Sequence, residues 1–140
     1  MKQLEKLLLN LISINSTNPD YSDKSVGEKE IVDFVYEYFK KHNIDCIKQE
    51  VMNERKNIVA KIDRNKNKET ILFCSHLDTV YIDGMKFNPK IIDGKIYGPG
   101  SCDAKASVAA MMNTFINIKD INHEKPNIYF AGVISLSYGV

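Results

Sequence analysis

The sequence predicts an α/β fold in which helices flank a mixed β-sheet. Three segments show the apolar spacing that is typical of amphipathic helices, and they alternate with short apolar segments of strand length. Because each such element has an apolar side to bury, the elements are expected to stack as layers around a common core. The chain has 140 residues, 44% of them hydrophobic, and contains no linker-like tract, so one globular unit is expected.

The predicted helices follow from apolar periodicity and from local start and stop signals. Leucine and isoleucine recur at helical spacing through the first dozen residues, and Asn18-Pro19 lies in the stretch that ends this helix. Ser25 and Glu28 form a capping-box pattern ahead of the second helix, and a third helix is expected over residues 105–118. The second helix is expected to bury one stripe of side chains: Ile31, Phe34, Val35, Tyr38 and Phe39.

The predicted strands are short apolar segments bounded by polar residues. Asp93-Gly94 lies between two apolar pairs and predicts a tight hairpin turn, whereas residues 80–89 are expected to form an irregular loop over the site. The apolar segment 70–75 is expected to be the central, buried strand. The four predicted strands of the main sheet are Asp45–Val51, Asn57–Ile62, Thr70–Ser75 and Asn127–Ile134.

Composition excludes several classes of function. A formal net charge of +1, with 26% charged residues, supplies no basic field, so nucleic acid and membrane surfaces are not expected partners. No apolar run is long enough to span a bilayer, and the lysine-studded amino terminus does not resemble a signal peptide. Three cysteines without metal-type spacing indicate a reducing compartment, which predicts a cytoplasmic location.

One imidazole and two carboxylates form the candidate site. His76 and Asp78 stand where the strand 70–75 ends, and their spacing of two places both side chains on the same side of an extended backbone. Asp103 follows a Gly-Pro-Gly turn and precedes the third helix. If these groups converge, their chemistry suits a divalent metal ion. The alternative interpretation is that His76 and Asp78 are a structural hydrogen-bonded pair in a loop.

Three stretches carry a family resemblance: S-H-L-D-T-V at 75–80, I-Y-G-P-G-S-C-D-A-K at 96–105 and V-A-A-M-M at 108–112. In order, spacing and flanks they resemble the zinc aminoacylase and deacetylase family of metallopeptidases. That family includes acetylornithine deacetylase, succinyl-diaminopimelate desuccinylase and glutamate carboxypeptidase. The likeness extends over nearly the whole chain but only over the first part of a family member.

The resemblance implies a role for each candidate residue. His76 would bind one metal ion, and Asp103 would bridge two zinc ions, with Co²⁺ or Mn²⁺ as alternatives. Asp78 would be the catalytic outer partner that orients the site, and the peptide between Asp103 and Ala104 would be cis. Lys105 matches the family by residue type, and its function stays open. The implied reaction is hydrolysis of the amide bond of N-acyl amino acids or short peptides, in which metal ions activate water and polarise the carbonyl group.

The chain departs from the family pattern near residue 140. By register, the general-base glutamate and the neighbouring carboxylate ligand of the family fall on Leu136 and Ser137. Leucine accepts no proton, and a neutral hydroxyl is a poor substitute for an anionic ligand. The remaining ligands and the lid or dimerisation domain would lie beyond Val140. We therefore expect residues 1–140 to be the amino-terminal portion of a metallohydrolase catalytic domain.

The recognisable ligands are fewer than a zinc site normally has. His76 and Asp103 make two, whereas three or four protein ligands are usual. Cys102, Asp83 and His123 are further candidates, of which Cys102 is expected to point away from the site and His123 to be a solvated loop residue. The chain alone is accordingly expected to bind zinc weakly and to hydrolyse no substrate at a useful rate.

Three hypotheses for function remain after the sequence analysis. The chain is the first part of a metal-dependent hydrolase, or a non-catalytic remnant kept for binding or assembly, or a small α/β module whose His-Asp pair is structural. The motifs are closest to the deacetylase and desuccinylase branch. The expected partners are a small N-acyl amino acid or peptide substrate and a second copy of the chain, bound through an open sheet edge.

Overall fold

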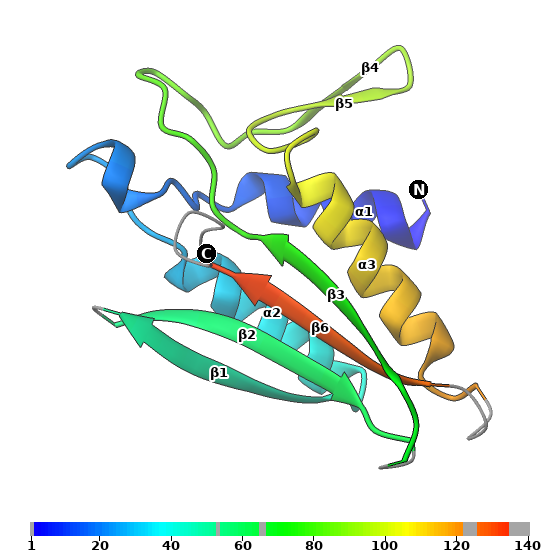
Figure 1. The fold of residues 1–140 in the computed structure, drawn as a ribbon. Helices are drawn as coiled ribbons and strands as arrows, with labels where there is room; N and C mark the ends of the chain where they lie inside the picture. The colour runs from blue at the N-terminus through cyan, green and yellow to red at the C-terminus, as the bar shows by residue number, and fades with distance from the viewer. Residues whose placement is uncertain (1, 53, 65–66, 122–125, 135–140) are drawn as a thin grey trace.

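The computed structural model describes residues 2–52, 54–64, 67–121 and 126–134 (Figure 1). Within these ranges helices and strands both form, but they do not alternate as predicted, because five consecutive strands lie between the second and third α-helices. In chain order they are α1 (Gln3–Ser13), the 3₁₀ helix η1 (Pro19–Tyr21), α2 (Lys29–Lys41), β1 (Asp45–Met52), β2 (Arg55–Ile62), β3 (Thr70–His76), β4 (Lys90–Ile92), β5 (Lys95–Tyr97), α3 (Lys105–Ile118) and β6 (Asn127–Val133). No helix in the described ranges combines the length and the apolar character that crossing a bilayer requires.

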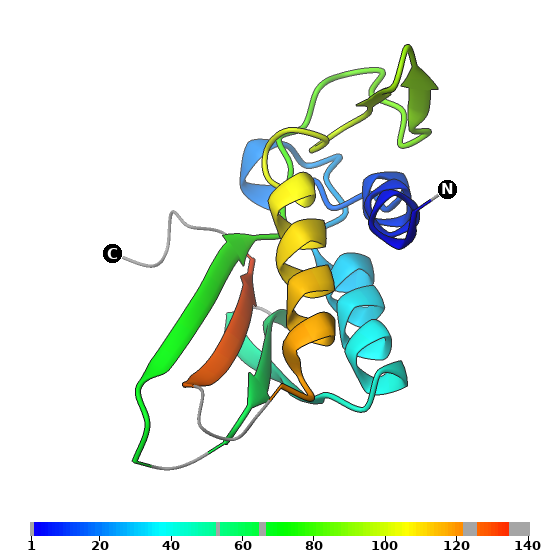
Figure 2. The same cartoon turned by 90° about the vertical axis from the view of Figure 1, so that its right-hand side faces the viewer.

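The main sheet is mixed, and its strands lie in the order β1-β2-β6-β3 (Figure 1). β6 runs antiparallel to β2 and parallel to β3. In the described part of the chain, α2 and α3 lie against one face of this sheet, and α1 packs beside α3 (Figure 2). The predicted α/β class with a mixed sheet flanked by helices is therefore confirmed.

Three phenylalanines join the helical layer to the sheet. Phe39 of α2 lies 5.5 Å from Phe115 of α3 and 5.3 Å from Phe130 of β6, measured between ring centroids. All three side chains are fully buried, and the rings meet at tilted or edge-on angles, which aromatic pairs prefer. This contact holds α2 and α3 against β6, with which β3 is paired.

The central position predicted for Thr70–Ser75 is wrong for the described sheet. β6 takes the inner position, and β3 pairs on one side only among the described residues. Consequently Ile71 and Leu72 are 47% and 58% exposed. An apolar run indicates that a strand has a surface to bury. It does not specify which strands pair with it, because those strands come from distant segments of the chain.

The predicted capping box between Ser25 and Glu28 is also wrong. Glu28 is the N-cap residue of α2, yet no side-chain cap hydrogen bond forms there. Its carboxylate instead accepts two hydrogen bonds from the guanidinium of Arg55. A charge-assisted bidentate pair is stronger than a bond to a helix N–H, so the distant arginine displaces the local cap.

The other predicted elements form with small differences. The stripe of α2 buries Ile31, Val35 and Phe39, as expected, whereas Phe34 and Tyr38 are half-buried and stack on each other at its border. The Asp93-Gly94 hairpin is confirmed: both residues have positive φ, 49° and 73°, as a two-residue hairpin turn between β4 and β5 requires.

Two leucines of α1 provide a matched test of this core. Leu11 is fully buried, whereas Leu4, on the same helix, is 39% exposed. Leu11→Ala is expected to lower the free energy of unfolding by about 2–5 kcal/mol, since it opens a cavity under α1. Leu4→Ala is expected to cost about 0.5 kcal/mol. Urea unfolding followed by circular dichroism measures both, and equal losses would contradict the packing described here.

Candidate metal centre

Backbone hydrogen bonds on both sides hold the segment that follows β3. Leu77 N–H donates to Val133 O at 2.8 Å, which continues the parallel pairing with β6. Thr79 then forms a parallel bridge with the loop after α1: its N–H donates to Ser16 O at 2.9 Å, and its carbonyl accepts from Asn18 N–H at 2.9 Å. The predicted site residues on this segment therefore stand on a well-supported backbone.

The imidazole of His76 lies between two carboxylates. Its Nδ1 is 3.1 Å from Asp78 Oδ1, and its Nε2 is 3.0 Å from Asp103 Oδ1. The side chain of Asp78 is 9% exposed and that of Asp103 is 87% exposed. One side of the ring thus faces an enclosed carboxylate, and the other faces a carboxylate that is open to solvent.

Asp103 is delivered by a tight turn ahead of α3. Gly100 has a φ of +75°, and its carbonyl accepts the N–H of Lys105, the first residue of α3, at 2.9 Å. The peptide between Asp103 and Ala104 is cis, as the family resemblance implies. A positive φ favours glycine, so the conformation of this turn depends on having glycine at position 100.

Lys105 anchors this turn to α1. Its Nζ donates to Ile14 O at 2.7 Å and lies 5.3 Å from the centroid of the Phe87 ring. The side chain is fully buried, and this burial lowers the pKa of the ammonium group to about 8. Lys105, whose function the sequence did not assign, therefore links the end of α1 to the turn that carries Asp103.

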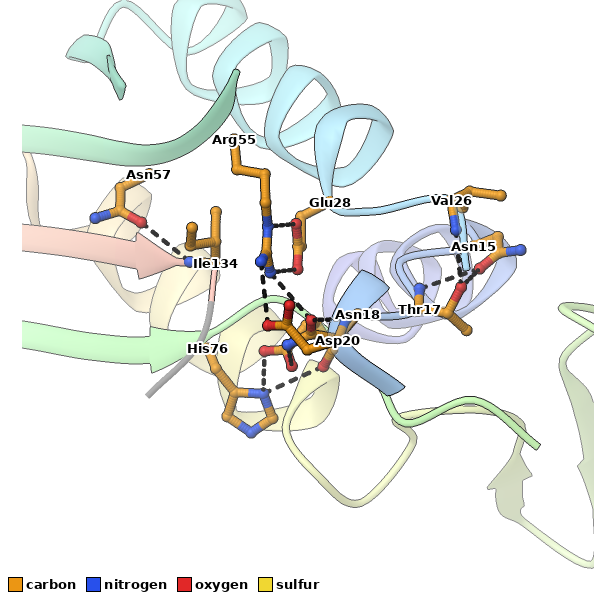
Figure 3. A network of polar contacts seen from close by, with 11 residues as sticks. Asn15, Thr17, Asn18, Asp20, Val26, Glu28, Arg55, Asn57, His76 and Ile134 are labelled. Carbon is orange, nitrogen blue, oxygen red and sulfur yellow. Dashed lines mark hydrogen bonds and ion pairs between the residues drawn. The ribbon is translucent and has the colours of Figure 1, made fainter. Parts of the chain in front are cut away.

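A polar network that includes Asn18, Glu28 and Arg55 (Figure 3) contacts Asp78 through Asn18. Asn18 Nδ2 donates to Asp78 Oδ2 at 2.9 Å, and Asn18 Oδ1 accepts from Arg55 Nη2 at 3.2 Å. Arg55 in turn binds Glu28 through Nε, at 3.0 Å, and Nη2, and it reaches Asp20 through Nη1 at 3.3 Å. Sequence reasoning named Asn18 and Glu28 only as local helix signals and missed these contacts, because they join positions that are far apart in the chain.

The charges of the site favour a protonated, tightly held His76 ring in the metal-free chain. The hydrogen bond to Asp78 raises the pKa of His76 to about 9, against the opposing effect of burial and with further help from Asp103. Burial acts to raise the pKa of Asp78, but hydrogen bonds from His76 and Asn18 outweigh it and lower this pKa. Asp78 therefore stays ionised and accepts the Nδ1 proton of His76.

Comparison with known proteins identifies the family. Residues 72–134, which carry His76, Asp78 and Asp103, match the sequence profile of Peptidase family M20/M25/M40. The chain belongs to this peptidase family. The resemblance found in the motifs is thereby confirmed.

Two curated relatives and one solved structure illustrate the match. The M20 chain is 38% identical to an uncharacterized metallohydrolase of Methanocaldococcus jannaschii, over 76% of this chain and 30% of that protein. It is 29% identical to succinyl-diaminopimelate desuccinylase of Wolbachia pipientis wMel, over 81% of this chain and 28% of that protein. The M20 family metallo-carboxypeptidase of Sulfolobus solfataricus has the same fold, with a TM-score of 0.77 and 20% identity over 96% of this chain and 31% of its own. The chain thus spans about 30% of the length of the curated relatives it matches.

The structure brings together the three predicted site residues of the M20 chain. His76 contacts Asp78 through Nδ1 and Asp103 through Nε2, so the two carboxylates lie at different nitrogens of the ring. Asp83 instead binds Lys24 and Tyr81 on the exposed loop. Cys102 is exposed, and the described ranges contain no group of three or more His, Cys, Asp or Glu residues that could hold a metal ion. Three predictions fall on residues that lie outside the described ranges: His123, Leu136 and Ser137.

The raised pKa of His76 predicts how the stability of the metal-free M20 chain depends on pH. Between its ordinary value of 6.5 and about 9, the native state binds more protons at His76 than the unfolded state does. The stabilising effect of His76 is therefore fully present below about pH 6.5 and is lost as the pH rises through about 9.

Urea unfolding of the unsubstituted chain and of His76→Gln, at several values between pH 6 and 9.5, measures this effect. The difference between the two is expected to shrink as the pH rises. Lys105, whose lowered pKa has the opposite effect between about 8 and 10.5, is present in both proteins and cancels. A difference that stays constant with pH would contradict the assigned contacts.

Proposed function

We propose that this chain supplies the first ligands of the metal centre of an M20 hydrolase that cleaves amide bonds in N-acyl amino acids or short peptides. The observation that carries the proposal is the 3.0 Å separation of His76 Nε2 and Asp103 Oδ1. Two ligand atoms that each lie about 2.0–2.2 Å from one tetrahedral ion are themselves about 3.3–3.6 Å apart. The two side chains would therefore have to move apart by only a few tenths of an ångström to bind one metal ion.

Each residue has a distinct part in the proposed site. His76 would bind the metal through Nε2, and Asp103, whose carboxylate is open to solvent, would bind it and bridge to a second ion. Asp78 holds the Nδ1 proton and so leaves Nε2 as the ligand atom. Zinc is the metal we favour, with Co²⁺ or Mn²⁺ as alternatives. A bound divalent ion of this kind lowers the pKa of water and polarises the scissile carbonyl group.

The proposed substrates follow from the named relatives. One relative is a desuccinylase, which supports an N-acyl amino acid, and the solved metallo-carboxypeptidase supports a peptide. Both names denote the cleavage of an amide bond next to an amino acid. We place the reaction in the cytoplasm on the basis of the three free cysteines.

We further propose that residues 1–140, as an isolated chain, form the amino-terminal portion of the catalytic domain and are inactive. The described residues offer two candidate ligands, His76 and Asp103, and no group of three or more that could hold a metal ion, whereas a zinc site normally has three or four. The general-base position of the family falls on Leu136 by sequence register, and leucine transfers no proton. The alternative of a purely structural His-Asp pair does not account for the second carboxylate on the same ring.

Metal content after dialysis tests the proposed site. The unsubstituted chain is expected to bind Zn²⁺ weakly, and both His76→Ala and Asp103→Asn are expected to reduce the affinity at least about tenfold, because each removes a ligand. His42→Ala and Asp83→Asn are the matched controls, since both residues lie away from the cluster. Elemental analysis and isothermal titration calorimetry provide the measurements.

Two results would overturn parts of this proposal. If His76→Ala changed the free energy of unfolding but left the zinc content unchanged, the pair would be structural. If the purified chain bound zinc tightly at a fixed stoichiometry, or hydrolysed an N-acyl amino acid, the isolated chain would not be inactive.

We also propose that the chain self-associates through β3. Its outer edge has no partner strand within the described residues, and Ile71 and Leu72 are largely exposed on it. Leu72→Lys is expected to lower the apparent mass at high protein concentration, since a charge on an edge strand opposes pairing. Ile92→Lys on the β4-β5 hairpin is the matched control, and light scattering is the measurement. A monomeric unsubstituted chain at high concentration would contradict this prediction.

A further inference from the structure

Asn18 stands at the centre of the polar network that contacts Asp78. Its side chain is buried, 2% exposed, in the loop that joins α1 to η1. The bond from its Nδ2 to Asp78 Oδ2 is itself buried and spans 60 residues of sequence. Burial of an amide group is costly unless its hydrogen bonds are made, so this side chain is held by its partners.

The partners of Asn18 also determine which way its amide points. Oδ1 accepts two hydrogen bonds, from Arg55 Nη2 at 3.2 Å and from Asp20 N–H at 3.0 Å. A flipped amide would direct its N–H groups at these two donors and its oxygen at the Asp78 carboxylate. Both contacts would be repulsive, so Nδ2 must face Asp78.

Arg55 is itself held in place by a buried acid. Glu28 is 2% exposed, and its two oxygens accept from Nε and Nη2 of Arg55. Burial raises the pKa of the Glu28 carboxyl, and the Arg55 guanidinium counters this effect. A continuous series of contacts therefore runs from the start of α2 through Arg55 and Asn18 to Asp78 (Figure 3).

The backbone fixes the distance between Asn18 and Asp78. The N–H of Asn18 donates to Thr79 O at 2.9 Å, directly after Asp78. The side-chain bond and the backbone bond thus join the same two segments side by side. Rotation of the Asp78 carboxylate away from His76 would break the side-chain bond while leaving the backbone bond in place.

We propose that Asn18 is a positioning residue of the metal centre: it holds Asp78 in the orientation that accepts the Nδ1 proton of His76, and so keeps His76 Nε2 directed at Asp103 and the metal. The inference rests on the proposed function for the metal, but the contacts themselves exist in the metal-free chain. Asn18 touches neither the metal ligands nor a reacting group, and it acts through Asp78.

Asn18→Asp is the substitution that tests the contact with Asp78 most directly. It keeps the oxygen that accepts from Arg55 and from the Asp20 N–H, and it replaces the donor to Asp78 with an oxygen that repels it. Asn15→Asp is the matched control, because it adds the same charge to the same loop. Asn15 Oδ1 accepts only from Thr17 in the described contacts and remains an acceptor.

The first measurement needs no metal. In ¹H–¹⁵N spectra of the metal-free chain, the Nδ1–H of His76 is expected to give a slowly exchanging ring signal in the unsubstituted protein and in Asn15→Asp. In Asn18→Asp the signal is expected to broaden or vanish. An unchanged signal in a folded Asn18→Asp chain would overturn the proposal.

A measurement on the unsubstituted chain keeps the proposal falsifiable if Asn18→Asp does not fold. The carboxamide protons of Asn18 are expected to exchange with solvent more slowly than those of Asn15, because Asn18 donates to a buried carboxylate. Equal exchange rates would contradict the assigned bond.

The second measurement is a double-mutant cycle on Zn²⁺ affinity. Asn18→Asp alone is expected to weaken Zn²⁺ binding about tenfold, within the range seen when outer partners of a ligand are changed. In an Asp78→Ala background it is expected to have no further effect, because the residue through which it acts is gone. An equal loss in both backgrounds would indicate a general structural effect and overturn the proposal. Absence of Zn²⁺ binding by the unsubstituted chain would instead contradict the proposed function, and the ring signal would then decide the role of Asn18.

Discussion

The hydrogen bond between His76 and Asp78 is the contact on which the candidate site depends. It joins Nδ1 to a carboxylate that is nearly enclosed, and so it determines which ring nitrogen faces outward. The opposite nitrogen meets Asp103, which is open to solvent. A ring held on one side only could rotate, whereas a ring tied through a buried acid presents Nε2 in one direction. The polar network that contacts Asp78 extends this constraint to α2.

The second carboxylate reaches the site by an independent route. Asp103 belongs to the turn before α3, and Lys105 fastens this turn to the last turn of α1. The phenylalanine cluster holds α2 and α3 against β6, which is paired with the strand that carries His76. The meeting of the two side chains is therefore a property of the whole packed layer and not of either loop alone.

β3 is an apolar strand that lies at an edge of the described sheet. Its sequence is nevertheless as apolar as that of a covered strand. The curated relatives are about three times as long as the region matched here, since it spans about 30% of them. The exposed apolar side chains of this edge strand leave a surface on which another strand can pair.

The sequence by itself determined the kinds of element and the chemistry of the site. Apolar periodicity predicted the helices, Asp93-Gly94 predicted the hairpin, and the motifs around His76 and Asp103 indicated the family, because these signals are local. Only the tertiary structure decided that β3 lies at an edge, that Glu28 binds Arg55 in place of a helix cap, and that Asn18 supports Asp78. These outcomes depend on contacts between residues 27 to 60 positions apart, or on strand neighbours from distant segments. No local pattern specifies such contacts, since packing alone brings the partners together.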